Sequence, residues 1–129
     1  MASENLLFTK EHEWVRIEGD IAEVGITDYA QHELGDVVYV ELPALGKELK
    51  KGDPAANIES VKAVSDVFAP LSGTITAVNP KLNNNPELVN QEPYGEGLLF
   101  KMKLNQLDEL KELLDQKKYE AYLQGIAGE

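Results

Sequence analysis

The chain has 129 residues, of which 23 are acidic and 12 are basic, for a formal charge of -11. This length favours one domain with its own core, and this charge argues against binding to nucleic acid or to an anionic membrane. Cysteine is absent, which excludes disulfides, thiolate metal sites and a cysteine nucleophile.

The first residues carry no pattern for export. They lack a basic stretch followed by an apolar run, and they are too acidic for a transit peptide. No apolar run in the chain approaches the length of a membrane span. We therefore expect a cytoplasmic protein of bacterial or archaeal type, without membrane association.

Most of the chain is expected to form short strands. The expected elements are, in order, a hairpin of strands 14–17 and 21–26, a helix 29–34, a strand 36–42, a charged turn 47–52, strands 55–59, 64–68 and 74–78, a loop with one helical turn at 87–90, and a strand 98–104. Thr27 or Asp28 can cap the helix, and Gly35 can end it. Two packed antiparallel sheets with a helical edge are the expected architecture.

The hydrophobic period changes near the C-terminus. Leu107, Leu110 and Leu114 fall at i, i+3 and i+7, which predicts an amphipathic helix that begins at Asn105 or Gln106. A further short helical turn is expected over 117–123. The C-terminal helical segment therefore covers about residues 106–124 of a single domain.

Lys62 stands between the two strand patterns 55–59 and 64–68. A lysine at the tip of a hairpin presents its ε-amine to a partner, and the strands fix where the amine points. An amide on that amine would remove the charge and make the side chain a long tether, as lipoamide and biotin carriers require.

The segment 59–75 resembles the lipoyl-attachment motif of the glycine cleavage system H-protein family. Other segments are similar to the same family, in order and at matching spacing: 12–15, 24–31, 34–38, 86–90 and 92–94. The similarity covers about residues 8–122. It implies a lipoyl/biotinyl-type fold, a barrel-sandwich hybrid of two antiparallel sheets, in one lipoyl-carrier domain over residues 1–129.

The resemblance implies a non-catalytic carrier with lipoate bound through an amide to Lys62. In the family, the lipoyl group accepts an aminomethyl group at glycine decarboxylase, a pyridoxal-phosphate enzyme, and delivers it to an aminomethyltransferase that uses tetrahydrofolate. Dihydrolipoamide dehydrogenase then reoxidises the arm. These enzymes and the lipoylating enzymes are the expected partners of what we expect to be a monomer.

Two acidic residues, Glu13 and Asp66, match positions that the family places near the cleft for the loaded arm. A carboxylate there could pair with the charged aminomethyl nitrogen and protect it from hydrolysis; each could equally be a solvated surface acid.

Two positions depart from the family pattern. Some members have a histidine near the cleft, at the position that matches Glu33. This chain has His32 one place earlier, so we do not assign a role in the cleft to His32. Many members have tryptophan where this chain has Leu98, which affects the expected packing. His12 and His32 are expected to be structural or surface residues, and no metal site or independent active site is expected.

Carriers of other systems fit less well. Biotin carriers usually flank the lysine with methionines, whereas Val61 and Ala63 flank Lys62 here. Lipoyl domains of 2-oxo acid dehydrogenases typically have aspartate before the lysine and are shorter. An H-like lipoyl relay, which passes the group to other enzymes, and a non-acylated binding protein of the same fold stay open.

Overall fold

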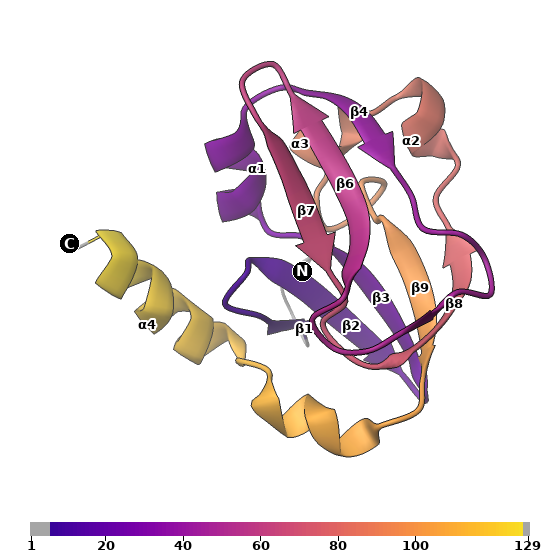
Figure 1. The fold of residues 1–129 in the computed structure, drawn as a ribbon. Coiled ribbons are helices and arrows are strands. Elements are labelled where there is room, and N and C mark those ends of the chain that lie inside the picture. Colours follow the sequence, from indigo (N-terminus) through magenta and orange to yellow (C-terminus); the bar gives the residue numbers. More distant parts are fainter. Residues whose placement is uncertain (1–5, 128–129) are drawn as a thin grey trace.

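The computed structural model describes residues 6–127, which form two antiparallel sheets and several short helices (Figure 1). The elements are β1 (Leu6–Phe8), β2 (Glu13–Glu18), β3 (Ile21–Ile26), α1 (Asp28–Leu34), β4 (Val37–Glu41), β5 (Glu48–Leu49), β6 (Pro54–Ser60), β7 (Val64–Phe68), β8 (Gly73–Val78), α2 (Lys81–Asn84), α3 (Leu88–Gln91), β9 (Phe100–Leu104), the 3-10 helix η1 (Leu107–Glu112) and α4 (Gln116–Ala127). The expected fold class, mainly β with two antiparallel sheets and a C-terminal helix, is confirmed.

The larger sheet has the strand order β1-β2-β3-β9-β8-β5, and each strand is antiparallel to its neighbours. Alternate residues of a strand point to the same face, so Val24, Ile75 and Met102 share the inner face and are completely or almost completely buried. Each such side chain contributes roughly 1.5–3 kcal/mol to folding.

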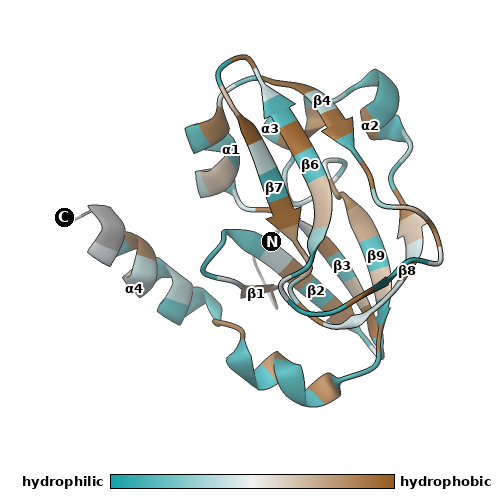
Figure 2. Cartoon of the chain, in the orientation of Figure 1, coloured by the Kyte–Doolittle hydropathy of each residue, from teal (hydrophilic) through white to brown (hydrophobic). Residues whose placement is uncertain are grey.

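The smaller sheet, β4-β6-β7, lies over the inner face of the larger one (Figure 1). Its Val40, Ile58 and Val67 belong to the same hydrophobic cluster as the inner face of the larger sheet. In β6, the buried Ala56 and Ile58 alternate with the polar Asn57 and Glu59 (Figure 2), and in β7 the buried Val67 follows the exposed Asp66. One face of the smaller sheet is therefore in the core, and the other faces solvent.

The predicted short helix is present as α1. Its N-cap is Thr27, whose hydroxyl oxygen accepts a hydrogen bond from the Ala30 N–H at 3.2 Å. Asp28, the alternative cap, instead accepts from the Gln31 side chain. Gly35 ends the helix at φ 80°, a conformation that suits glycine, and its N–H donates to the Gln31 carbonyl.

Three short elements were not predicted: β1, β5 and α2. β5 has two residues, and it is a strand because Glu48 and Leu49 pair with Thr74 and Gly73. β1 likewise has three residues that pair with β2. Strands of two or three residues are too short to show a hydrophobic period in the sequence, so only their pairing with a partner strand reveals them.

The C-terminal segment differs in type from the prediction. The leucine pattern that begins at Leu107 forms the 3-10 helix η1, and Leu107 itself is 52% exposed. Leu114 then forms two backbone hydrogen bonds of 2.7 Å with Phe8. In α4, Tyr119 stacks on the Phe8 ring with 4.6 Å between centroids. Phe8, Trp14 and Tyr119 belong to a second hydrophobic cluster, and Leu98 packs against it.

Within residues 6–127, no helix has both the length and the apolar character that crossing a bilayer requires.

Candidate functional site

Lys62 lies at the exposed tip of the β6–β7 hairpin, as predicted. The two strands pair up to Glu59 and Val64, and the Ser60 N–H donates to the Ala63 carbonyl at 2.8 Å. The Ser60 hydroxyl oxygen accepts hydrogen bonds from the backbone N–H groups of Lys62 and Ala63, at 3.2 and 3.0 Å. A serine side chain thus orders the loop that carries the lysine.

The loop between α1 and β4 supports this tip from the side. The Val61 N–H donates to the Asp36 carbonyl at 3.0 Å. A Cβ on Gly35 would lie 3.5 Å from Cε of Lys62, so the lysine stem runs close to the Gly35 backbone. The hairpin tip is consequently held by a second segment, far from it in sequence.

Asn90 of α3 holds that supporting loop in place. Its Oδ1 accepts from the Val37 N–H at 2.8 Å, and its Nδ2 donates to the Gly35 carbonyl at 2.8 Å and to Gln31 Oε1 at 3.0 Å. All of its side-chain hydrogen-bonding groups are therefore used at one loop. The sequence did not single out Asn90, because these partners are more than 50 residues away along the chain.

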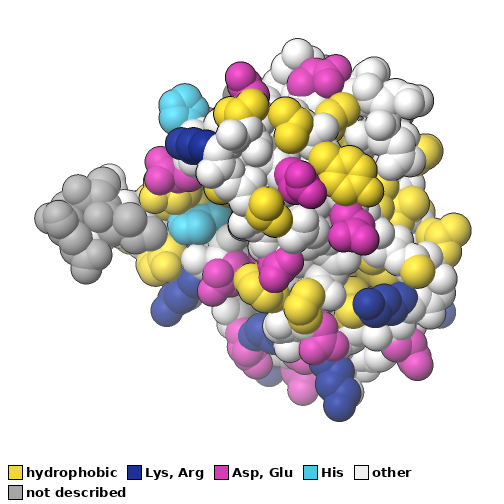
Figure 3. All heavy atoms as spheres, turned by 45° about the horizontal axis from the view of Figure 1, so that its top comes forward, with side chains coloured by type: hydrophobic (Ala, Val, Ile, Leu, Met, Phe, Trp, Pro, Cys, Tyr) yellow, Lys and Arg dark blue, Asp and Glu magenta, His cyan; other side chains and the backbone are white. Residues whose placement is uncertain are grey.

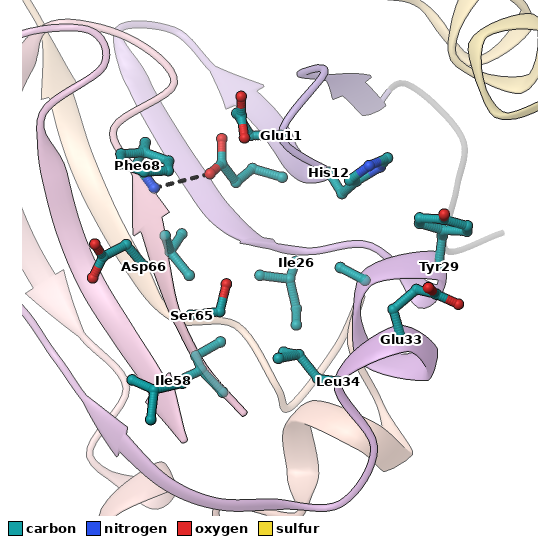
Figure 4. A pocket seen from close by; sticks show the side chains of 14 residues that line it. Glu11, His12, Ile26, Tyr29, Glu33, Leu34, Ile58, Ser65, Asp66 and Phe68 are labelled. Atoms are coloured by element: carbon teal, nitrogen blue, oxygen red, sulfur yellow. Dashed lines mark hydrogen bonds between the residues drawn. The ribbon is translucent and has the colours of Figure 1, made fainter. Parts of the chain in front are cut away.

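A groove of about 500 Å³ runs along β7 between the two sheets and α1 (Figure 4). Ile26, Leu34 and Ile58 are among its apolar lining residues. Its acidic lining residues are Glu11, Glu13, Glu33 and Asp66. The described lining includes no lysine or arginine, so the groove favours a ligand with an apolar body and a positive charge.

Glu13 lies in this lining, and the residue is 2% exposed. Its Oε1 accepts from the Thr9 hydroxyl at 2.8 Å, and its Oε2 accepts from the Phe68 N–H at 2.9 Å (Figure 4). The bond to Phe68 joins β2 of the larger sheet to β7 of the smaller one. Burial raises the pKa of Glu13 to about 7, although both hydrogen bonds act in the opposite direction.

Asp66 lies on β7 and is exposed, and its Oδ1 accepts from the Asn57 side chain at 2.9 Å. The structure thus brings Glu13 and Asp66, which are 53 positions apart in the sequence, to one groove. Glu33 lines the same groove from α1, whereas His32 lies outside it and lines a separate hollow near α4.

A polar cluster links the groove to α4. The Tyr119 hydroxyl is 2.8 Å from the Thr27 hydroxyl oxygen and 2.9 Å from Nδ1 of His12. His12 has a left-handed backbone with φ 68°, and its ring lies 4.6 Å from the Tyr29 ring in the groove lining. Desolvation by burial lowers the pKa of His12. No local sequence pattern predicts this cluster, because Tyr119 is about a hundred residues from its partners.

In the described part of the chain, no group of three or more His, Cys, Asp or Glu side chains is arranged to hold a metal ion. The site brings together an exposed amine, an ordered loop and a groove with acidic lining residues.

A family model described as the glycine cleavage H-protein matches residues 6–126. The chain belongs to this family. A glycine cleavage system H protein of Thermotoga maritima is 57% identical over 115 residues, which are 89% of this chain and 93% of the relative. One from Bacteroides thetaiotaomicron is 52% identical over 122 residues, or 95% of this chain and 97% of the relative.

A solved H-protein structure agrees with this assignment. The crystal structure of the glycine cleavage system H protein from Mycobacterium marinum matches with a TM-score of 0.78 and 35% identity, over 89% of this chain and 93% of that one. The resemblance seen in the sequence is thereby confirmed. As an H-protein family member, the chain is a lipoyl-bearing, non-catalytic shuttle component of the glycine cleavage system.

Proposed function

We propose that Lys62 is the residue that bears lipoate, in an amide linkage, and that the groove along β7 receives the loaded arm. One observation carries this proposal: Lys62 is the exposed residue of a loop ordered by Ser60, and it stands at the end of the strand that lines a carboxylate groove. Among the residues at this tip, Lys62 alone has an amine that can form the amide.

Attachment forms a bond between Nζ of Lys62 and the carboxyl carbon of an activated lipoate. The bond from that carbon to the activating group breaks, and the amine gives up a proton. A lysine amine with an ordinary pKa of about 10.4 is mostly protonated at neutral pH, so the attaching enzyme must assist its deprotonation. When bound, lipoate supplies a disulfide that takes up a carbon unit on reduction and is regenerated by oxidation.

The residues of the chain itself then position and protect the cargo. β7 extends about 13 Å from Val64 to Phe68 at about 3.3 Å per residue, so a flexible arm that begins at the tip can lie back along it. The apolar lining excludes water, and the carboxylates of Glu13 and Asp66 pair with a positively charged nitrogen. Water exclusion and charge pairing together protect the aminomethyl group while the arm moves from glycine decarboxylase to the aminomethyltransferase.

The proposed partners are glycine decarboxylase, the aminomethyltransferase, dihydrolipoamide dehydrogenase and the enzymes that attach lipoate. All of them must reach the lysine or its arm, and the exposed tip gives that access. We further propose a cytoplasmic monomer. Fractionation of cells that express the full chain tests the location, and size-exclusion chromatography with light scattering tests the monomer.

Intact-mass measurement of the full chain from a lipoate-competent host tests the attachment. The wild type and the control Lys47→Arg should gain the mass of one lipoyl group, whereas Lys62→Arg should gain none. A lipoyl group on Lys62→Arg would show that the assignment of the lysine is incorrect.

Exchange of labelled bicarbonate into glycine tests the role in glycine cleavage. Exchange should require both the lipoylated chain and glycine decarboxylase. If the lipoylated chain does not support exchange but donates its lipoyl group to other carriers, the relay function is correct instead.

The groove is tested with the loaded carrier. Asp66→Asn should release ammonia faster than the wild type, whereas the control Glu41→Gln, at an acid outside the groove, should not. Equal release by Asp66→Asn and the wild type would remove Asp66 from the proposed site.

A further inference from the structure

The turn that joins β1 to β2 carries a threonine whose hydroxyl group makes three hydrogen bonds. The oxygen of Thr9 accepts from the backbone N–H groups of Glu11 and Glu13, at 3.2 and 3.1 Å. Its hydrogen is donated to Oε1 of Glu13, with 2.8 Å between the oxygens. A hydroxyl group has one donor and two acceptor sites. Since the backbone of the turn uses both acceptor sites, the hydroxyl hydrogen is directed at the Glu13 carboxyl group.

The Glu13 carboxyl group is held by two donors that come from different strands. Thr9 donates to Oε1 beside β2, and the Phe68 N–H donates to Oε2 at 2.9 Å from β7. One donor on each oxygen fixes the plane of the carboxyl group in the groove lining. An ionised carboxylate has about four acceptor sites, so each oxygen keeps a site for a positively charged nitrogen of the cargo.

Both hydrogen bonds favour the ionised form of Glu13, because a charged oxygen is the better acceptor. Burial, and to a smaller extent the negative charge of Glu11, act in the opposite direction and raise the pKa of Glu13 to about 7. Acidic side chains are also spread over the side of the molecule that carries the hairpin tip (Figure 3). The two donors therefore decide whether Glu13 is charged at neutral pH.

Few other groups can take over this task. Glu13 lines both the groove and a neighbouring hollow of about 260 Å³. Within the described lining of the two, Lys51 is the only lysine or arginine, and it is paired with Glu112. The charged or titratable residues that line the groove or the hollow together with Glu13 are Glu11, His12, Tyr29, Glu33, Lys51 and Asp66.

We propose that Thr9 is a positioning residue of the groove, whose hydroxyl group keeps the Glu13 carboxylate ionised and aimed at the aminomethyl nitrogen of the loaded arm. The inference depends on the proposed function, because it assumes that Glu13 pairs with that nitrogen. Thr9 lines the hollow and not the groove. It therefore acts on the cargo through Glu13 and not by direct contact.

Carbon-13 NMR of the unmodified full chain measures the ionisation of Glu13 directly. The signal of its side-chain carboxyl carbon should titrate with a midpoint near pH 7 in the wild type. Thr9→Val should move this midpoint upward by about 1, because a hydrogen bond to the charged form is lost. Thr9→Ser should restore the wild-type midpoint. The control Thr76→Val, at an exposed threonine of β8, should leave it unchanged.

Ammonia release from the loaded carrier at pH 7 tests whether this ionisation protects the cargo. A midpoint that rises from about 7 to about 8 lowers the ionised fraction of Glu13 from about one half to about one tenth. Thr9→Val should therefore release ammonia up to about fivefold faster than the wild type. In a Glu13→Gln background the same change should alter release by less than about twofold, whereas a residue that only shapes the turn would act equally in both backgrounds.

Thermal midpoints show that each variant is folded in the assay, and Thr9→Ala replaces Thr9→Val if the valine variant melts too early. An unchanged titration midpoint, an unchanged rate of release, or an equal effect in both backgrounds would overturn the role of Thr9. Equal release by Glu13→Gln and the wild type would instead overturn the pairing of Glu13 with the cargo, on which the inference depends.

Discussion

Replacement of Asn90 by alanine removes three hydrogen bonds that hold the loop beside the lysine hairpin. Two of them serve backbone groups, the Val37 N–H and the Gly35 carbonyl. A net contribution of about 0.5–1.5 kcal/mol for each bond predicts a loss of roughly 2–4 kcal/mol in the free energy of unfolding. Denaturant titration measures this loss.

The same change should loosen the hairpin tip. The loop that Asn90 holds provides the Asp36 carbonyl, which accepts from the Val61 N–H. Hydrogen exchange at the Val61 amide should therefore accelerate more than exchange in β9, and the rate of acylation of Lys62 should fall.

Asn79→Ala is the matched control. The Asn79 side chain also holds a loop through two backbone carbonyls, those of Glu96 and Leu98, but that loop lies away from the hairpin. Asn79→Ala should lose comparable stability without slower acylation at a temperature where both variants are folded. If both asparagine variants acylate at the same rate, the argument that Asn90 positions the lysine is refuted.

Three further predictions concern the core and the groove. Glu13→Gln should become more stable relative to wild type as pH rises from about 4.5 to about 7, by up to about 3 kcal/mol, because the pKa of Glu13 is raised to about 7 in the folded protein and the ionised form is disfavoured there. Gly73→Ala should lower the free energy of unfolding by several kcal/mol, measured by denaturant titration, because a Cβ would overlap the Lys103 carbonyl group. Tyr119→Phe should lose about 1–2 kcal/mol and speed amide exchange in α4, because the hydroxyl bonded to Thr27 is lost while the ring stack is kept.

Each of these predictions has a result that contradicts it. A stability difference between Glu13→Gln and wild type that is constant from pH 4 to pH 8 would mean that the Glu13 pKa is not raised. For Gly73→Ala the control is Gly125→Ala, since a Cβ at residue 125 meets nothing within 4 Å and alanine favours the helix. Equal denaturant midpoints for the two variants would contradict the predicted overlap at Gly73. Unchanged exchange in α4 of Tyr119→Phe would show that stacking alone docks the helix.

The hairpin was predictable from sequence because its signals are local. Two β-rich runs with a short connection predict paired strands. The family resemblance of the motif around Lys62 predicted that this lysine carries the lipoyl group. The groove was not predictable by spacing. Glu13 and Asp66 were predicted only through the family resemblance. They line the same groove because one sheet packs on the other.

Contacts between distant segments explain most of what the sequence did not predict. Asn90 and Tyr119 read as ordinary residues of helical segments, and their partners become visible only when α3 and α4 are docked. The leucines after β9 have helical spacing, yet the chain there forms a 3-10 turn and then extends so that Leu114 can bond to Phe8. Tertiary pairing overrides local periodicity in both cases.

The ordered loop at Lys62 has a consequence for proteolysis. Trypsin cleaves after a free lysine and needs several residues of extended backbone, whereas the 61–63 loop is closed by bonds to Ser60 and Asp36. Cleavage of the unmodified chain therefore requires this loop to open first, at a rate set by local unfolding. Acylation removes the cleavage site altogether, so the tip is protected in two ways: by its hydrogen bonds before modification, and by its chemistry afterwards.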